Sequence, residues 1–352
     1  MLYTYIVYNA VLLSGSFFAY LSDKAKNKFS INIFYLISFL SVLSVLILRY
    51  NVGTDYNSYE YIYYHIKEDE NYLEPGFIFL LKLCQQYSLS SEVFIGIFSL
   101  ISTSFIYLTA RHYNKLIFIT FYILVLYFQN MTAIRQITAV CIALYALHFL
   151  IQRKNITFII FIILSSLFHS STLLLLPFIL CNNIQFNKKN YLPFILAIIA
   201  SAIYLDIFNI ISELNILQGT KYQSYLNSKF SAPTQLGSGL GVILKTVPPL
   251  LLSIYFFNKE KYTYALLYAL NIAYIISIIL SAKIHIFNRL PPIFCIAVPY
   301  SLYFMSNHYR TLKYILIITF IFLIFFENDI RISDKSLNKG LGITPYTSIF
   351  EK

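Results

Sequence analysis

Long apolar runs separated by short polar breaks are the feature that most restricts how this chain can fold. Each run is close to the roughly 20 residues that a helix needs to cross a bilayer. A helix satisfies its own backbone hydrogen bonds in lipid, and the short alternating segments typical of a membrane β-barrel are not seen. The runs cover residues 3–21, 31–49, 93–110, 115–129, 134–151, 192–212, 238–257, 262–281, 289–306 and 312–326.

Composition points to a membrane protein in the same way. Hydrophobic residues make up 58% of the chain and charged residues 12%, whereas soluble domains carry about a quarter charged residues. We therefore predict an all-α polytopic membrane protein with roughly 10–12 transmembrane or re-entrant helices. Residues 1–352 are expected to form a single transmembrane domain, and the first run is expected to be a retained span. The four cysteines lack the spacing of a disulfide framework or a zinc site.

The basic residues set the expected orientation of the helices. The formal net charge of +11 is spread over short breaks between the apolar runs. This pattern is typical of the positive-inside rule and argues against a nucleic-acid partner. With the N- and C-termini outside, all of these breaks fall on the cytoplasmic side. They are Lys24/Lys26/Lys28, Arg111/Lys115, Arg153/Lys154, Lys188/Lys189, Lys259/Lys261 and Arg310/Lys313.

The longer polar segments then collect on the opposite, outer side. The first is an outer loop over residues 50–92, and its apolar part, 76–87, is too short to span and predicts a re-entrant helix. The others are the outer loop 213–237 and the C-terminal tail 327–352. A functional site is therefore expected at the outer face.

The loop after the second run is acidic and rich in tyrosine. Thr54 or Asp55 can cap a short helix that begins near Tyr56. On that helix, Tyr56, Tyr59 and Tyr63 fall on one face. Aromatic rings beside a carboxylate suit a sugar, because the rings stack on its C–H face and the acid accepts from its hydroxyls. The alternative is an interfacial amphipathic helix with a solvated acidic end.

Two further groups could act on a bound substrate. Glu74 directly precedes a proline, which keeps it extended and could direct its carboxylate across the outer face; an ordinary turn acid is the alternative. Residues 156–182 are predicted to form two short helices that meet at His169. A neutral imidazole there could accept a proton near pH 7, and a structural histidine is the alternative.

Three arginines stand at the predicted outer ends of apolar runs: Arg49, Arg135 and Arg289. An unpaired arginine in hydrocarbon costs at least ~2.5 kcal/mol, so each should face a cavity or a partner. The guanidinium fork matches phosphate oxygens, and three arginines together would cradle a diphosphate. The alternatives are contacts with lipid headgroups or pairing with Asp55 and Glu74.

Additional sugar contacts are expected from Gln136, Tyr222 and Tyr225. Gln136 is next to one of the arginines. Tyr222 and Tyr225 lie in the 213–237 loop, which could close over a substrate as a lid or be an ordered surface loop.

Four segments taken in order resemble a known family. They are RYNVGTDYNSY, LEPGFIFLLKL, RQITAVCIALYALHFLIQRK and SSLFHSSTLLLLPFIL, within residues 45–182. Together they resemble the EpsG-like branch of the Wzy-type polysaccharide polymerases. The resemblance implies a GT-C-like helical bundle in a bacterial inner membrane. It also implies polymerisation of O-antigen, capsule or exopolysaccharide repeat units at the periplasmic or outer face.

The resemblance further implies a glycosyl donor and acceptor carried on undecaprenyl diphosphate, with membrane lipids around the protein. Chain-length regulator and flippase proteins are partners that it allows for. In this hypothesis Arg135 and Arg289, with Arg49, neutralise the departing diphosphate. Asp55 or His169 is the general base, and Glu74 positions sugar hydroxyls or shares that role. No cofactor or metal is required, although Asp55 and Glu74 leave Mg²⁺ or Mn²⁺ open.

Other functions stay open from the sequence. A lipid-linked-sugar flippase or transporter would show mid-membrane polar residues and inverted repeats, which are not visible here. An O-antigen ligase would share the lipid donor but use lipid A core as acceptor. An acyltransferase would need a histidine reached from the cytoplasmic face, and a purely structural role is the last alternative.

Overall fold

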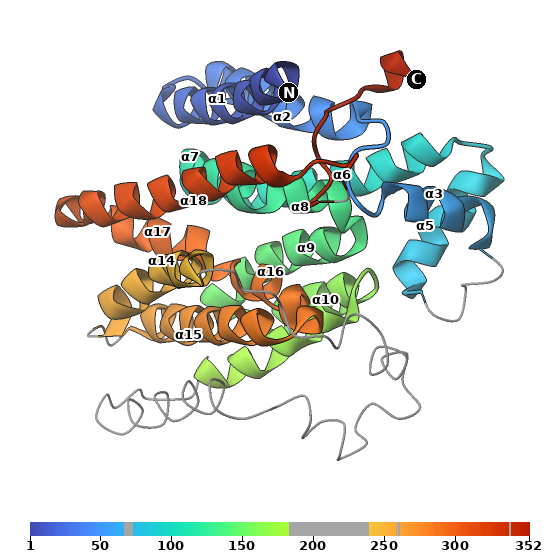
Figure 1. Ribbon diagram of the computed structural model, residues 1–352. Coiled ribbons are helices and arrows are strands. Elements are labelled where there is room, and N and C mark those ends of the chain that lie inside the picture. Colours follow the sequence, from blue (N-terminus) through green and yellow to red (C-terminus); the bar gives the residue numbers. More distant parts are fainter. Residues whose placement is uncertain (67–72, 183–238, 258, 260, 338) are drawn as a thin grey trace. The chain divides into compact units, whose positions relative to one another are not determined.

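A computed structural model describes residues 1–66, 73–182, 239–257, 259, 261–337 and 339–352. The chain divides into two compact units, which are described separately below. Unit 1 contains Met1–Leu173 and Phe322–Lys352, and unit 2 contains Leu174–Ile321. Figure 1 shows that the described elements are almost all helices.

Unit 1 is a helical bundle. The long helices α1 and α2 form an antiparallel pair, and α2, α7 and α9 pack against α6 or against one another. Within the stretch Lys115–Thr132 the helix changes to a π-helix, η2 (Tyr122–Leu126), between α7 and α8. The elements are α1 (Leu2–Lys24), α2 (Lys28–Leu48), α3 (Tyr56–Tyr64), α5 (Pro75–Gln86), α6 (Ser91–Ala110), α7 (Lys115–Phe121), α8 (Tyr127–Thr132), α9 (Ile134–Ile151) and α10 (Asn155–Ser166).

Several helices of unit 1 begin at side chains that cap them. The side-chain oxygen of Asn27 accepts from the Ser30 N–H at 2.6 Å, and that of Asn114 accepts from the Ile117 N–H at 3.0 Å. Each cap satisfies one of the N–H groups that a helix leaves unpaired at its start. Asp23 adds a second contact at the start of α7, since its carboxylate accepts from the Leu116 N–H at 3.0 Å.

The basic breaks of unit 1 lie together at one end of its helices. Lys115 pairs with Asp23 at 3.1 Å, which joins the α1–α2 turn to the start of α7. The Tyr113 hydroxyl bonds His148 Nδ1 at 2.9 Å, which brings the end of α9 to the same place. For unit 1, this confirms the predicted gathering of basic breaks at one end. Which side of the membrane this end faces stays a prediction.

The opposite end of unit 1 carries the polar loops. The Gly53 N–H donates to Gly342 O at 2.9 Å, and the Tyr346 N–H donates to Thr4 Oγ1 at 3.0 Å. The start of α1, the loop after α2 and the C-terminal residues therefore lie on one side, as Figure 1 also shows. This is the relative placement that the sequence predicts for both termini and the 50–92 loop.

Unit 2 contains a second group of packed helices. Helix α14 (Leu240–Phe257) packs on α15 (Tyr262–Lys283), and both contact α17 (Ala297–Ser306). The buried Asn271 on α15 donates to Ser301 Oγ on α17 at 2.9 Å. Between these helices lie the 3₁₀-helix η5 (His285–Arg289) and α16 (Pro291–Phe294). The last long helix, α18 (Leu312–Ile332), begins in unit 2 and ends in unit 1.

Seven of the described helices are long and apolar enough to cross a membrane. They include α1, α2, α6, the α7–α8 stretch, α9, α14 and α15. The predicted all-α polytopic membrane fold is confirmed, and so are the short helix near Tyr56 and the helix break at His169. The predicted 192–212 run and the 213–237 loop, with Tyr222 and Tyr225, lie outside the described residues.

Candidate functional site

Arg135 stands at the start of α9, directly after a break in the chain. Helix α8 ends at Thr132, and Ala133 leaves the helical region with φ −102° and ψ 62°. The break lets α9 begin at a new angle and places Arg135 within its first turn. Because the N–H groups of this first turn and the guanidinium lie together, positive electrostatic potential gathers at this point.

Glu74 is the partner of Arg135. Its Oε2 atom accepts from Arg135 Nη1 at 2.6 Å, and the exposed fractions of the two side chains are 6% and 26%. Glu74 occupies the N-cap position of α5 but makes no side-chain cap bond to that helix. Its extended backbone, φ −70° and ψ 143°, is the conformation favoured before Pro75. The sequence alternative in which Arg135 pairs with Glu74 is therefore realised.

Two aromatic side chains complete the surroundings of the guanidinium. The Arg135 Cζ atom lies 5.3 Å from the centre of the Phe77 ring, within the range of a cation–π contact. Tyr59 is near enough to Arg135 for the guanidinium to act on it: burial raises the pKa of Tyr59, and the guanidinium charge lowers it. Arg135 Nε is buried and has no hydrogen-bond partner among the described residues. We call Arg135, Glu74, Tyr59 and Phe77 the Arg135 cluster.

Asp55 lies beside the Arg135 cluster and is exposed. It precedes α3, and its backbone oxygen accepts from the Tyr59 N–H at 3.0 Å. Its side chain does not cap the helix, contrary to expectation; it accepts instead from Thr54 Oγ1 at 3.1 Å. The negative charge of Asp55 acts on Tyr59, which itself contacts Arg135. The structure therefore brings Asp55, Glu74 and Arg135 to one end of unit 1.

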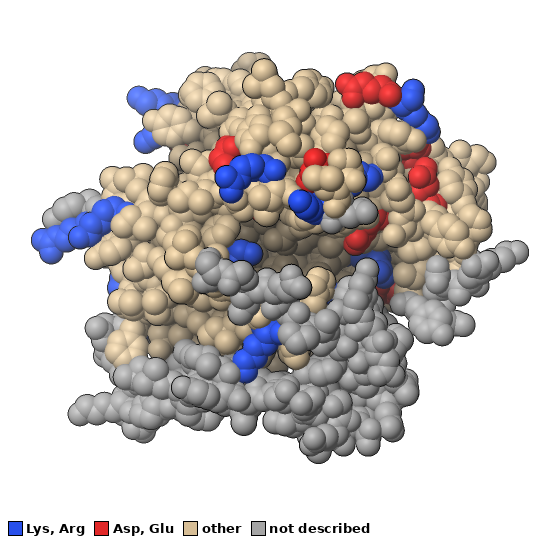
Figure 2. Space-filling view, in the orientation of Figure 1, with Lys and Arg blue, Asp and Glu red and all other residues tan. Residues whose placement is uncertain are grey.

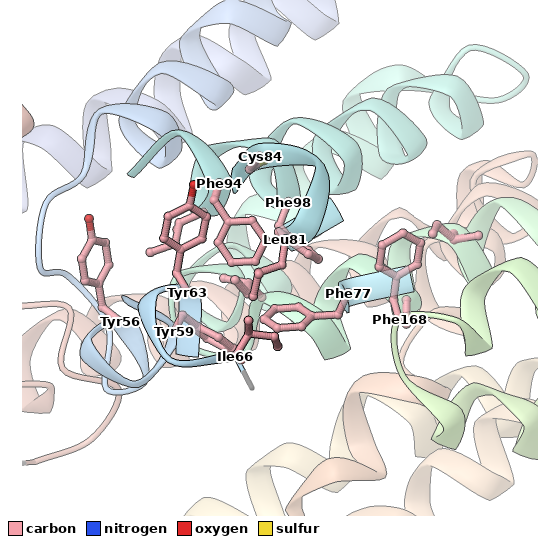
Figure 3. Close-up of a cluster of buried hydrophobic side chains, with 14 residues drawn as sticks. Tyr56, Tyr59, Tyr63, Ile66, Phe77, Leu81, Cys84, Phe94, Phe98 and Phe168 are labelled. Carbon is pink, nitrogen blue, oxygen red and sulfur yellow. The ribbon is translucent and has the colours of Figure 1, made fainter. Parts of the chain in front are cut away.

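The tyrosine face of α3 exists but points inward. Tyr56, Tyr59 and Tyr63 are 1%, 5% and 3% exposed. Figure 3 shows their rings beside a buried cluster in which Tyr63 lies 5.3 Å from Phe94 and Tyr59 lies 6.1 Å from Phe77. The predicted stacking of a sugar on Tyr56 and Tyr59 disagrees with this burial, because packing on α5 and α6 covers the ring faces.

His169 lies at the break between α10 and the 3₁₀-helix η3 (Ser170–Asn182). Its Nδ1 atom is 2.5 Å from Ser171 Oγ, and the residue is 7% exposed. The same break meets the start of α5, because the Gly76 N–H donates to Leu167 O at 2.8 Å. A Cβ atom at Gly76 would lie 2.8 Å from that oxygen, so glycine permits the approach. The residue two positions before His169 therefore contacts the residue two positions after Glu74.

Arg49 is inside the bundle rather than at its surface. It is 1% exposed, and its guanidinium donates to Leu46 O at 2.8 Å, Ser99 Oγ at 3.0 Å and Asn130 O at 3.4 Å. The Asn130 side chain in turn donates to the Tyr122 hydroxyl on the π-helix at 2.7 Å. The predicted binding of a diphosphate by Arg49 disagrees with this burial. Its long side chain instead reaches inward and links α2, α6 and α8.

The remaining predicted site residues are placed separately. Gln136 is 7% exposed and follows Arg135 on α9. Arg289 is half-buried at the end of η5 in unit 2, so its convergence with Arg135 stays a prediction. In Figure 2 most of the visible Asp and Glu side chains gather over the end that carries α3, α5 and the C-terminal residues. Lys and Arg side chains lie among them.

A metal site was left open at Asp55 and Glu74. The observed partner of the Glu74 carboxylate is the Arg135 cation, which a divalent ion would have to displace. Among the residues that the structure describes, no three or more His, Cys, Asp or Glu side chains gather as a metal site would require.

Sequence reasoning missed the contribution of residues 333–337 and 339–352, here called the C-terminal segment, to this end of the unit. Ser333, Ile343, Thr344 and Tyr346 of the segment are buried. The signal in this segment was the run GLGITPY, whose glycines and proline mark turns. Gly340 and Gly342 have φ of 59° and 63°, which glycine adopts without strain.

The helices and their apolar lengths define a multi-pass, all-α membrane protein with a charged cluster at one end of unit 1. Comparison with protein-family models matches residues 32–348 to the EpsG family, and the chain belongs to that family. Membership suggests a role like that of polysaccharide polymerases, which are glycosyltransferase-like. No curated protein and no solved structure matches the chain.

Proposed function

We propose that this protein joins undecaprenyl-diphosphate-linked oligosaccharide repeat units of a bacterial surface polysaccharide. The reaction is a glycosyl transfer at the periplasmic or outer face of the inner membrane. The observation that carries the proposal is the pairing of Arg135 with Glu74 beside the exposed Asp55. This arrangement puts a cation for a phosphate and a carboxylate for a hydroxyl at one end of the helices.

Arg135 supplies the charge for the leaving group. A guanidinium has five N–H donors, and one of those on Arg135 is occupied by Glu74. A diphosphate competes for the same fork, because its oxygens match the guanidinium bidentately. When the diphosphate binds, Glu74 is released and becomes available for sugar hydroxyls.

Asp55 acts as the general base. Asp55 is exposed, whereas Glu74 is buried and is assigned to the sugar hydroxyls. The acceptor hydroxyl oxygen forms a bond to the anomeric carbon of the donor sugar as its proton passes to Asp55. The bond from that carbon to the diphosphate oxygen breaks, and undecaprenyl diphosphate leaves with the electron pair. Arg135 stabilises the negative charge on the departing oxygen.

The direct test is elongation of purified lipid-linked repeat units by the purified protein. Long chains on the lipid carrier are expected, with release of undecaprenyl diphosphate. Movement of the lipid-linked unit across a vesicle membrane without elongation would instead indicate a flippase. Transfer to lipid A core alone would indicate a ligase.

Asp55→Asn is expected to reduce the elongation rate by roughly 10²–10⁴-fold, because the amide cannot accept the hydroxyl proton. Binding of undecaprenyl diphosphate should be unchanged, since the base does not hold the donor. Glu60→Gln is the matched control. It removes a carboxylate from α3, the helix that follows Asp55, and the observed partner of this carboxylate is Ser91. Equal elongation rates for the two variants would show that Asp55 is not the base.

Glu74→Gln is expected to bind undecaprenyl diphosphate more tightly, by about tenfold, because Arg135 no longer has an anionic competitor. Elongation should fall, since the carboxylate for sugar hydroxyls is lost. The affinity can be measured by displacement of a fluorescent polyprenyl diphosphate. Weaker binding by Glu74→Gln than by the unchanged protein would contradict competition between Glu74 and the diphosphate.

A further inference from the structure

The C-terminal segment forms continuous backbone contacts with the loop that follows α2. Tyr50 N–H donates to Thr347 O at 2.9 Å, Gly53 N–H to Gly342 O at 2.9 Å and Thr54 N–H to Leu341 O at 3.1 Å. Figure 1 shows this segment running beside the loop that leads to α3. The segment therefore contacts the residues that immediately precede Asp55.

The segment is itself anchored to three long helices. Tyr8 on α1 donates from its hydroxyl to Ile343 O at 2.7 Å. The Tyr346 hydroxyl donates to Val45 O on α2 at 3.1 Å, and Lys352 pairs with Glu92 on α6 at 2.6 Å. These contacts lie far apart in sequence, so the segment ties the loop to the helices of the bundle.

The Lys335 side chain joins the C-terminal segment to the loop by hydrogen bonds. Its ammonium group donates to both the backbone oxygen and the side-chain oxygen of Asn51. Asn51 has a φ of 55°, a left-handed conformation that asparagine adopts more readily than most non-glycine residues. The two contacts from one ammonium group join Asn51 to the C-terminal segment in this conformation.

The same loop also contacts the break that precedes Arg135. Gly53 has a φ of 104°, and a Cβ atom there would lie 2.1 Å from Met131 O. The loop thus lies between the C-terminal segment on one side and the α8–α9 break on the other. Its position sets the start of α3, and hence of Asp55, relative to Arg135.

We propose that the C-terminal segment is a positioning element of the site, with Lys335 as its central residue. The inference rests on the proposed function for what the positioned groups do. Lys335 touches no reacting atom; it holds Asn51, which holds the loop that carries Asp55. Loss of the contacts between Lys335 and Asn51 lowers the elongation rate and leaves the long helices packed.

Two native cysteines distinguish release of α3 from unfolding of the helix bundle. Cys84 on α5 is 1% exposed in the buried cluster that holds Tyr63 of α3. Cys141 on α9 is 0% exposed within the helix bundle. Release of α3 should uncover Cys84, whereas unfolding of the bundle should uncover both.

The experiment compares Lys335→Met, Lys335→Arg and Lys339→Met in the full-length purified protein. Lys339 is an exposed lysine of the same segment and serves as the matched control. Thiol labelling is read by mass spectrometry at each cysteine, and elongation of lipid-linked repeats is read in parallel. Lys335→Met should label about tenfold faster at Cys84 only and elongate about tenfold more slowly, and Lys335→Arg should restore both.

The outcomes separate the inference from the proposed function. Identical Cys84 labelling in Lys335→Met and Lys339→Met overturns the positioning role, whatever the activity. Labelling of both cysteines also overturns it, because the segment would then stabilise the whole bundle. If the unchanged protein does not elongate at all, the proposed function fails, and the labelling still decides whether Lys335 positions the loop.

Discussion

Arg135→Met is expected to reduce elongation by roughly 10²–10³-fold, the cost of removing one donor from a site that stabilises a developing negative charge. The variant also removes the Arg135 cation from beside the Glu74 carboxylate, which is 6% exposed. Breaking a buried ion pair from one side costs up to about 3–5 kcal/mol, so the amount of folded protein should fall as well. Both effects can be measured on purified protein, as elongation rate and as thermal stability.

The double variant Arg135→Met/Glu74→Gln separates these two effects. It removes both charges, so folded protein should return toward the normal amount while elongation stays low. Arg111→Met is the control variant, because it removes an exposed arginine at the basic end of unit 1. Elongation by the double variant at the normal rate would show that Arg135 serves only to neutralise Glu74.

Gly53→Ala is expected to disrupt the site more than any other change of a single small residue. A φ of 104° is strained for alanine by about 1–3 kcal/mol. The added Cβ would also lie 2.1 Å from Met131 O, a backbone atom that no side-chain rotation can move away. We expect elongation to be lost and the unfolding temperature to fall by at least roughly 1–4 °C. A thiol-reactive dye can follow unfolding, because the four cysteines are buried.

Gly96→Ala is the control for this change. A Cβ atom at Gly96, within α6, would meet Ile47 Cγ2 at 3.6 Å, an ordinary van der Waals distance. Alanine is favoured over glycine in a helix interior by about 1 kcal/mol, so this variant should be at least as stable as the original. If both variants behave alike, the close approach of Gly53 to Met131 does not exist in the membrane.

Gly53→Ala and Gly96→Ala together test whether a contact between two separate segments positions the charged groups of the site. Arg135 and Asp55 come from separate segments of unit 1, and each lies where a helix begins after an irregular stretch. The break at Ala133 and the loop at Gly53 contact each other directly. The position of each charge therefore depends on the other segment as much as on its own.

The sequence predicted most of the described helices because their signal is local. The 289–306 run, expected as one span, is instead divided among η5, α16 and α17, since Pro291 and Pro292 follow Arg289. Apolar runs of membrane-spanning length can satisfy their backbone only as helices, so their positions follow from hydropathy alone. The short helix at Tyr56 and the break at His169 were also predicted correctly, from turn residues and a proline. The gathering of basic breaks at one end of unit 1 followed from the alternation of the spans.

The direction of individual side chains could not be predicted in the same way. The periodicity of Tyr56, Tyr59 and Tyr63 placed them on one face, but only contacts with α5 and α6 turn that face inward. Arg49 was expected to help hold a diphosphate at the outer end of its span, yet Ser99 and Asn130 provide oxygens for it inside the bundle. The residues that contact the three tyrosines and Arg49 come from distant parts of the chain.

What the sequence by itself determined is the class of the protein, its helical spans and the end of unit 1 at which polar residues gather. Length, hydropathy and charge act locally, so each can be judged from a short window. Only the tertiary structure decided that Arg135 meets Glu74, that the tyrosines are buried and that the C-terminal segment holds the loop before Asp55. These contacts join residues tens to hundreds of positions apart, and they depend on how the helices pack.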